Sequence, residues 1–169
     1  MMKQVCVPMF LVLSLSLIAL DAAASPDMPV FEELFAKYDV IRGALASDTL
    51  TGVADAANEM ARTADMATHM HPGGKAGASV TEMRNTAPVL QRIGVEARAV
   101  AKAATLDDAR AAFGKLSASL IDYRKARHVQ SGVVVYCPMV KQSWLQRDQK
   151  IANPYYGASM QKWGEIVKD

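Results

Sequence analysis

Apolar side chains recur at helical spacing along most of the chain and predict four helices. The first stripe steps by three or four residues, which places its members on one face of a helix. It consists of Phe31, Leu34, Tyr38, Ile41 and Leu45. The second stripe consists of Leu50, Val53, Ala57, Met60, Ala64 and Ala67. Ser47-Asp48 precedes it and offers residues of the type that cap a helix N-terminus.

Two further stripes follow a Pro-Gly-Gly break at 72–74. Ser79-Val80-Thr81-Glu82 has the form of a capping box, so a third helix is expected there, and Pro88 should kink it or mark its true start. Its stripe is Leu90, Ile93, Ala97, Val100 and Ala104. A fourth helix is expected from Thr105, because Asp107 and Asp108 suit the positive end of a helix dipole. Its core face is Leu106, Ala109, Phe113, Leu116, Leu120 and Tyr123.

These four amphipathic helices, joined by short turns, predict an all-α fold, an antiparallel four-helix bundle. The remaining segment, 133–165, is expected to be irregular and to carry a metal site. Val133-Val134-Val135-Tyr136 is apolar enough for a short strand or an extended stretch against the bundle. It is too isolated to predict a sheet.

The N-terminus has the pattern of a cleaved signal peptide, residues 1–24. Lys3 precedes an apolar run over 5–20, and Ala22-Ala23-Ala24 supplies small residues for cleavage. The run is short for a membrane span, although an uncleaved anchor is the alternative. We therefore expect one mature domain, 25–169, in the periplasm with no membrane span. Cleavage would also remove Cys6 and leave Cys137 as the only cysteine.

Composition narrows the function classes. Apolar residues make up 51% and charged residues 21% of the chain, which fits a packed core. The net charge of +2 is too small for a nucleic-acid footprint. The sequence lacks a glycine-rich phosphate loop, a His-Glu-x-x-His pattern and a nucleophile elbow. We therefore expect a protein that is not an enzyme.

Segment 133–165 holds residues that suit a soft metal ion. Cys137 and Met139 stand two residues apart, and Met160 follows an Asn-Pro-Tyr-Tyr-Gly turn. In an extended segment, residues two apart face the same side, so Cys137 and Met139 would converge. Thiolate and thioether ligands select Cu(I) and similar ions. The alternative is that Cys137 is a small buried hydrophobic residue, as free cysteines often are.

The same segment resembles a known domain family. The matching residues are Tyr136-Cys137-Pro138-Met139, Trp144-Leu145, Ile151, Asn153-Pro154-Tyr155-Tyr156-Gly157, Met160 and Gly164-Glu165, with a similar first-helix stretch over 38–48. The family is a small helical domain, long labelled of unknown function. It occurs alone or fused to periplasmic adaptor subunits of copper and silver efflux systems. The resemblance implies an exported helical domain that handles Cu(I), with Ag(I) as a second candidate ion.

Carried over residue by residue, the resemblance implies Cys137, Met139 and Met160 as metal ligands. The chain departs from the family pattern at Trp163, where a second cysteine often stands. An indole has no lone pair for ordinary ligation, so this residue is not a ligand. Trp163 or Trp144 would instead screen a bound ion from water.

A second candidate metal cluster is Met66, His69, Met70 and His71. The first three share a helical face, and mixed thioether and imidazole ligands suit copper. The alternative is that these residues cover the turn at Pro72. His128 is a candidate extra ligand, or a cation that favours the C-terminal end of the fourth helix.

The sequence therefore leaves two candidate functions. The first is an exported soft-metal-binding protein in copper handling or efflux, whose partners are the ion and periplasmic efflux components. The second is a helical interaction module of an envelope or efflux assembly with no metal of its own.

Overall fold

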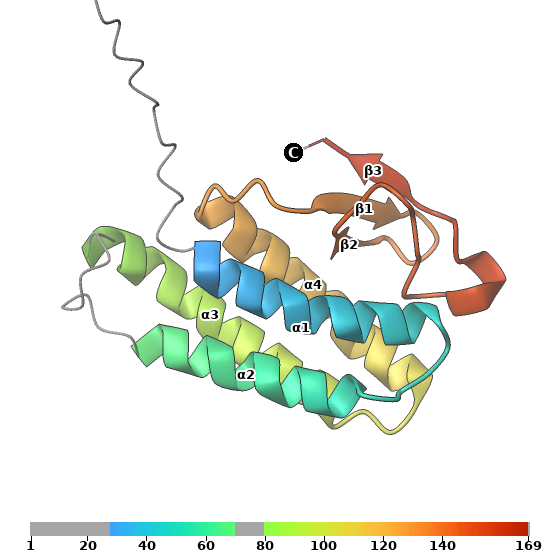
Figure 1. Ribbon diagram of the computed structural model, residues 1–169, viewed down its shortest axis with the longest axis horizontal. Helices are drawn as coiled ribbons and strands as arrows, with labels where there is room; N and C mark the ends of the chain where they lie inside the picture. The colour runs from blue at the N-terminus through green and yellow to red at the C-terminus, as the bar shows by residue number, and fades with distance from the viewer. Residues whose placement is uncertain (1–27, 70–79, 169) are drawn as a thin grey trace, which may run out of the picture.

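The computed structural model describes residues 28–69 and 80–168. In these residues four α-helices form an antiparallel bundle: α1 (Met28–Ala46), α2 (Val53–His69), α3 (Val80–Ala101) and α4 (Leu106–Ala126). A three-stranded sheet lies across the side of the bundle formed by α1 and α4 (Figure 1). The predicted signal peptide, Met70, His71 and the first residue of the predicted capping box, Ser79, lie outside the described residues.

The predicted stripes form the core between the helices. All five residues of the first stripe are fully buried on α1, and Phe113 and Leu116 are fully buried on α4, as predicted. Thr105 caps α4, because its hydroxyl accepts a hydrogen bond of 3.1 Å from the backbone N–H of Asp108. Sequence periodicity therefore located the four helices and most of their buried faces. Two predicted stripe members, Leu50 and Ala104, lie outside α2 and α3, and Ala104 is exposed.

Three details of the helices differ from the sequence prediction. Helix α2 begins at Val53, so Ser47-Asp48 is not its N-cap. Pro88 lies inside α3 and does not mark its start. Asp48 has a φ of +54°, a left-handed conformation that turns the chain away from α1.

The predicted all-α fold is wrong, because segment 133–165 contributes to a sheet and makes the fold mixed α/β. The strands are β1 (Val133–Cys137), β2 (Gln142–Gln146) and β3 (Glu165–Val167), in the order β2-β1-β3. Both neighbouring pairs are antiparallel. β1 is thus the central strand, and its backbone groups bond to strands on both sides.

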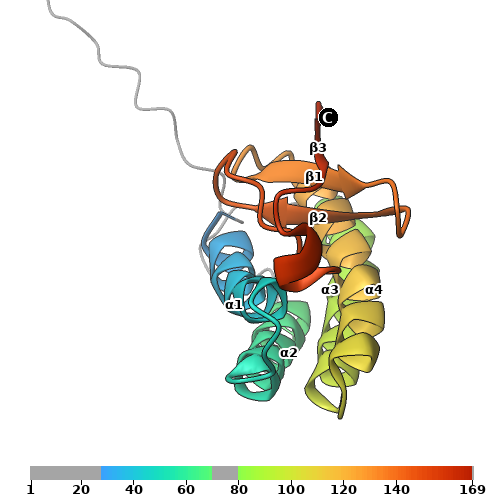
Figure 2. The same ribbon diagram turned by 90° about the vertical axis from the view of Figure 1, so that its right-hand side faces the viewer.

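Both faces of the sheet are covered at its centre. Val134 and Leu145 lie on one face and Val135 and Trp144 on the other, and all four are buried. The short 3₁₀ helix η1 (Gly157–Met160) lies beside the C-terminal end of α1, below the sheet (Figure 2). A strand buried on both faces has no need of polar residues at alternate positions.

None of the helices in residues 28–69 and 80–168 is both long and apolar enough to cross a membrane.

Candidate functional site

The thiol of Cys137 lies at the end of β1, and its side chain is fully buried. The cysteine is free. The side-chain amide of Asn153 donates a hydrogen bond of 3.4 Å to its sulfur. The thiol is therefore covered by the fold and lies against the amide of Asn153.

Asn153 joins the thiol to the turn at 160–163. The same amide nitrogen that contacts Cys137 also donates a hydrogen bond of 2.8 Å to the carbonyl oxygen of Trp163. Its backbone N–H donates to the carbonyl of Gln161 at 2.7 Å, and its side-chain oxygen accepts from the N–H of Tyr155 at 2.8 Å. Asn153 is fully buried and holds three segments in one arrangement.

Met160 therefore lies in a turn that adjoins the thiol. It is the last residue of η1, it is half-buried, and its carbonyl accepts a hydrogen bond of 3.0 Å from the N–H of Trp163. The sequence predicted that Met160 and Cys137 belong to one site. The structure brings their two backbone segments together through Asn153.

Met139 occupies a different setting from the one the sequence argument assumed. β1 ends at Cys137, and residues 138–141 form the turn into β2. The alternation that would place residues 137 and 139 on one side of an extended strand therefore stops before Met139. The side chain of Met139 is 59% exposed. It lies at the surface two residues from a thiol that is fully covered.

The two tryptophans have different roles in the structure. Trp144 is a core residue: it is fully buried, its ring lies edge-on to Tyr155 with centroids 5.9 Å apart, and its N–H donates to Gln146. Trp163 is 60% exposed. The backbone carbonyl of Trp163 shares the amide of Asn153 with Cys137, whereas Trp144 pairs with Val135, which faces the same side of β1 as Cys137.

A second set of polar contacts fastens this region to the helices, and sequence reasoning missed it. The carboxylate of Asp48 accepts hydrogen bonds from the guanidinium of Arg110 and from the N–H of Ala158, the latter at 2.8 Å. These contacts hold the pKa of Asp48 below its ordinary value, with the Ala158 hydrogen bond the largest cause. Arg110 also donates to the carbonyls of Leu45 and Pro154, each at 3.0 Å. We call Asp48, Arg110 and Gly157 the clamp.

Gly157 completes the clamp because nothing larger fits. Its φ of +52° is one that glycine adopts readily. A Cβ atom built on it would lie 1.9 Å from a carboxylate oxygen of Asp48. The clamp therefore joins the Asn-Pro-Tyr-Tyr-Gly turn to the end of α1. Both segments belong to the part of the sequence that resembles the copper-associated domain family.

The second candidate cluster is only partly described. Met66 is 59% exposed and His69 is exposed, both near the end of α2. They line a surface groove of about 610 Å³ that also includes Pro29 and Val30. Met70 and His71 lie outside the described residues.

His128 does not join the Cys137 region. It follows α4, has a φ of +52° and is exposed. It precedes the start of β1, whereas Cys137 stands at the other end of that strand, and a five-residue strand spans roughly 13 Å.

No group of three or more His, Cys, Asp or Glu side chains in residues 28–69 and 80–168 is placed to hold a metal ion. The predicted ligand set contains one such residue, Cys137, and otherwise relies on methionine sulfur.

Comparison of the chain with known proteins identified no relative. No protein-family model, curated protein or solved structure matches the chain, so its resemblance to the copper-associated helical domain stays a prediction.

Proposed function

We propose that the protein binds one Cu(I) ion, with Ag(I) as a substitute, where Cys137 adjoins the 160–163 turn. The observation that carries this proposal is the shared hydrogen bonding of Asn153, which joins a buried thiol to the turn that contains a methionine. Thiolate and thioether sulfur together favour a soft monovalent ion. The proposal includes export to the periplasm and a role in copper handling or efflux.

Each predicted ligand has a distinct part in this proposal. Cys137 supplies the only anionic sulfur, and it binds as the thiolate, so binding releases a proton. The Asn153 hydrogen bond compensates part of the charge on that sulfur. Met139 and Met160 supply neutral thioethers. Met139 is the exposed one, so it would contact an incoming ion before the covered thiol does.

The direct test is an anaerobic titration of Cu(I) against a chromophoric chelator. Cys137→Ser should weaken binding at least about a hundredfold, because it removes the only anionic ligand, whereas Met139→Leu should weaken it by about tenfold. Met66→Leu is a matched control, since Met66 and Met139 are both 59% exposed. Unchanged binding by folded Cys137→Ser would refute the site.

The titration also separates this site from the cluster on α2. Met66→Leu combined with Met70→Leu should leave binding unchanged if Cys137 holds the ion. Loss of binding in this double variant, with Cys137→Ser unaffected, would assign copper to the α2 cluster instead.

Trp163→Cys provides a gain-of-function test. The carbonyl of residue 163 already shares the Asn153 amide with the sulfur of Cys137. A thiol here would add a second anionic ligand, and we expect Cu(I) affinity to rise by at least about tenfold under reducing conditions.

A second candidate function is an interaction module without a metal. The edge strand β3 favours it, because all three residues are exposed, and Ile166 and Val167 present apolar side chains at 43% and 41% exposure. Unpaired strand edges readily pair with another chain. A mature chain that retains no Cu(I), Ag(I) or Zn(II) after titration would favour this function over metal binding.

A further inference from the structure

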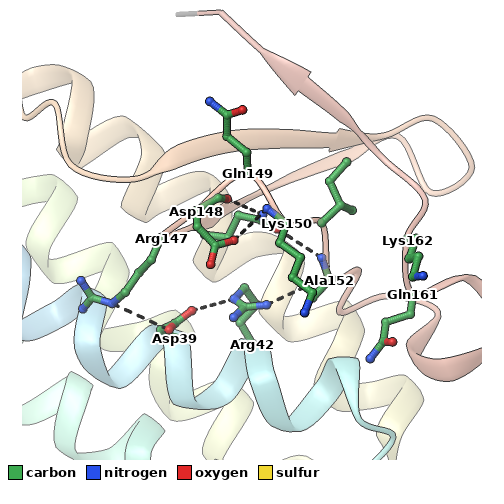
Figure 3. A pocket seen from close by; sticks show the side chains of 11 residues that line it. Asp39, Arg42, Arg147, Asp148, Gln149, Lys150, Ala152, Gln161 and Lys162 are labelled. Carbon is green, nitrogen blue, oxygen red and sulfur yellow. Dashed lines mark hydrogen bonds and ion pairs between the residues drawn. The ribbon is translucent and has the colours of Figure 1, made fainter.

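A polar pocket of about 650 Å³ opens beside the sheet, and Gln161 and Lys162 of the 160–163 turn line part of it. Its walls come from α1, from the end of β2 with the loop that follows, and from the turn after η1 (Figure 3). Charged side chains dominate it: Arg42, Arg147, Lys150 and Lys162 are cationic, and Asp39 and Asp148 are anionic. The pocket therefore carries an excess of positive charge.

The two carboxylates of the pocket already have partners. Asp39 accepts a hydrogen bond of 2.7 Å from Nε of Arg42, and its other oxygen lies 3.8 Å from Nε of Arg147. Asp148 accepts a hydrogen bond of 2.8 Å from the backbone N–H of Lys150. Neither carboxylate pairs with a lysine ammonium group of the pocket.

Two cationic side chains of the pocket, Lys150 and Lys162, have no carboxylate partner among the described residues. In the part of the chain that the structure describes, no carboxylate lies within ion-pair distance of the ammonium groups of Lys150 and Lys162. Figure 3 shows the side chain of Lys150 pointing into the pocket. Both lysines line the same concave surface, and a concave surface with excess positive charge attracts an anion.

The arginine side of the pocket is held in place before any ligand arrives. Arg42 donates from Nε to Asp39 and from Nη1 to the carbonyl of Ala152 at 3.3 Å, so among the described residues its Nη2 is the nitrogen without a hydrogen bond. Arg147 lies over the ring of Phe35, 4.7 Å from its centroid. A fixed guanidinium loses little conformational entropy when it binds an oxyanion.

We propose that this pocket binds a small phosphate-bearing ligand with at least two negative charges. Lys150 and Lys162 contact its oxygens as point charges, and the open edge of Arg42 donates to one of them. The same chemistry would recognise a free phosphate compound or a phospholipid headgroup. The metal proposal does not require this site, and the two can fail separately.

Inorganic pyrophosphate is the probe for the free ligand. Lys150→Gln with Lys162→Gln should weaken its binding at least about tenfold, because charge-assisted hydrogen bonds to two cations are lost. The matched control, Lys102→Gln with Lys168→Gln, changes the net charge equally at exposed lysines outside the pocket. Calorimetry measures the affinity, and amide NMR shifts should concentrate at 147–152 and 161–162.

Vesicles of phosphatidylglycerol are the probe for the headgroup. Binding of pyrophosphate that only the pocket variant loses identifies a free phosphate ligand. Binding of vesicles alone, again lost only in the pocket variant, identifies a lipid headgroup. Equal losses in the pocket variant and the control, or binding of neither probe by the parent chain, would overturn the proposal.

Discussion

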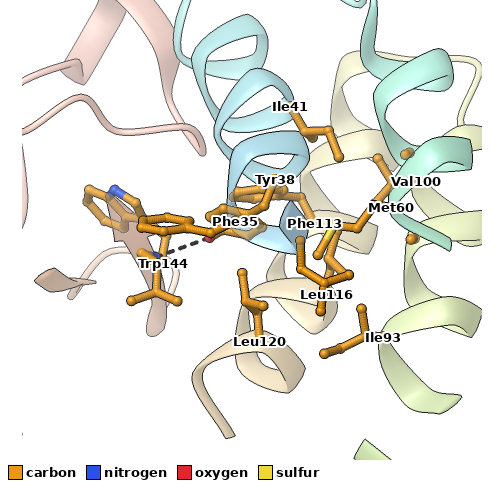
Figure 4. Packing of buried hydrophobic residues seen from close by; sticks show 14 of the residues in the cluster. Phe35, Tyr38, Ile41, Met60, Ile93, Val100, Phe113, Leu116, Leu120 and Trp144 are labelled. Carbon is orange, nitrogen blue, oxygen red and sulfur yellow. Dashed lines mark hydrogen bonds between the residues drawn. The ribbon is translucent and has the colours of Figure 1, made fainter. Parts of the chain in front are cut away.

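Replacing Tyr38 with phenylalanine tests how the sheet is attached to the bundle. Tyr38 is fully buried on α1, and its ring stacks on Phe113 with centroids 4.9 Å apart (Figure 4). Its hydroxyl shares a hydrogen bond of 2.7 Å with Ser117 on α4 and accepts one of 3.1 Å from the N–H of Leu145 on β2. One oxygen atom therefore links two helices and a strand.

The expected cost follows from what the substitution leaves behind. Phenylalanine keeps the ring packing but removes the acceptor for the Leu145 N–H, and a buried N–H without a partner costs about 1–3 kcal/mol. The hydroxyl of Ser117 loses this partner but keeps its interaction with Tyr155. We expect a total of about 2–3 kcal/mol, or a fall in Tm of roughly 6–12 °C for a domain of this size.

Guanidinium chloride unfolding, followed by circular dichroism and by the fluorescence of buried Trp144, measures this cost. Tyr123→Phe is the matched control, because Tyr123 is also a buried helical tyrosine but its hydroxyl makes no hydrogen bond within the described part of the chain. It should change the free energy of unfolding by less than about 0.5 kcal/mol. An equally small change for Tyr38→Phe would refute the idea that this hydroxyl joins the sheet to the bundle.

Three further predictions concern the core and the clamp. Phe113→Ala should cost about 3–5 kcal/mol in a denaturant titration, because the ring is fully buried, and a cost below about 1 kcal/mol would contradict its place in the core. Gly157→Ala should destabilise the fold by more than the roughly 1 kcal/mol of an ordinary glycine replacement, because its Cβ collides with Asp48; unfolding curves that overlay those of the parent would contradict this. The depressed pKa of the Asp48 carboxyl means that its contribution to stability is present above the ordinary carboxyl pKa and is lost as pH falls through the lower folded-state value. Asp48→Asn should therefore flatten the dependence of Tm on pH in the acidic range, and a slope identical to the parent's would show that the clamp does not titrate.

The helices were predictable and the sheet was not, for a physical reason. Helical stripes such as Phe31 to Leu45 are local patterns, and each one reports on a single face buried against one core. In β2, Trp144 and Leu145 are consecutive and both buried, so the polar alternation of a half-exposed strand is missing. β3 has only three residues, all exposed, and its pairing with β1 depends on contacts distant in sequence.

The candidate site was predictable in its residue types but not in its architecture. Cys137 and Met160 stood out because soft sulfur ligands are uncommon in such a pattern. Asn153 did not, because a turn asparagine usually bonds its own backbone, and this one also reaches Cys137 and Trp163. The capping prediction for Asp48 identified a real acceptor of a backbone N–H. The N–H belongs to Ala158, however, and not to α2.

The central position of β1 has a consequence for the order of folding. Its neighbour β3 follows it by about 30 residues, and the hydrogen bond from Leu145 to Tyr38 spans 107 residues. During synthesis, α1 is therefore made long before β2, whose Leu145 N–H donates a hydrogen bond to the hydroxyl of Tyr38. Contacts this distant in sequence form slowly, so we expect the helices to collapse first and the C-terminal segment to dock last. A chain that stops short of Val133 would expose the apolar side of α1 and α4 that β1 and β2 cover in the finished fold.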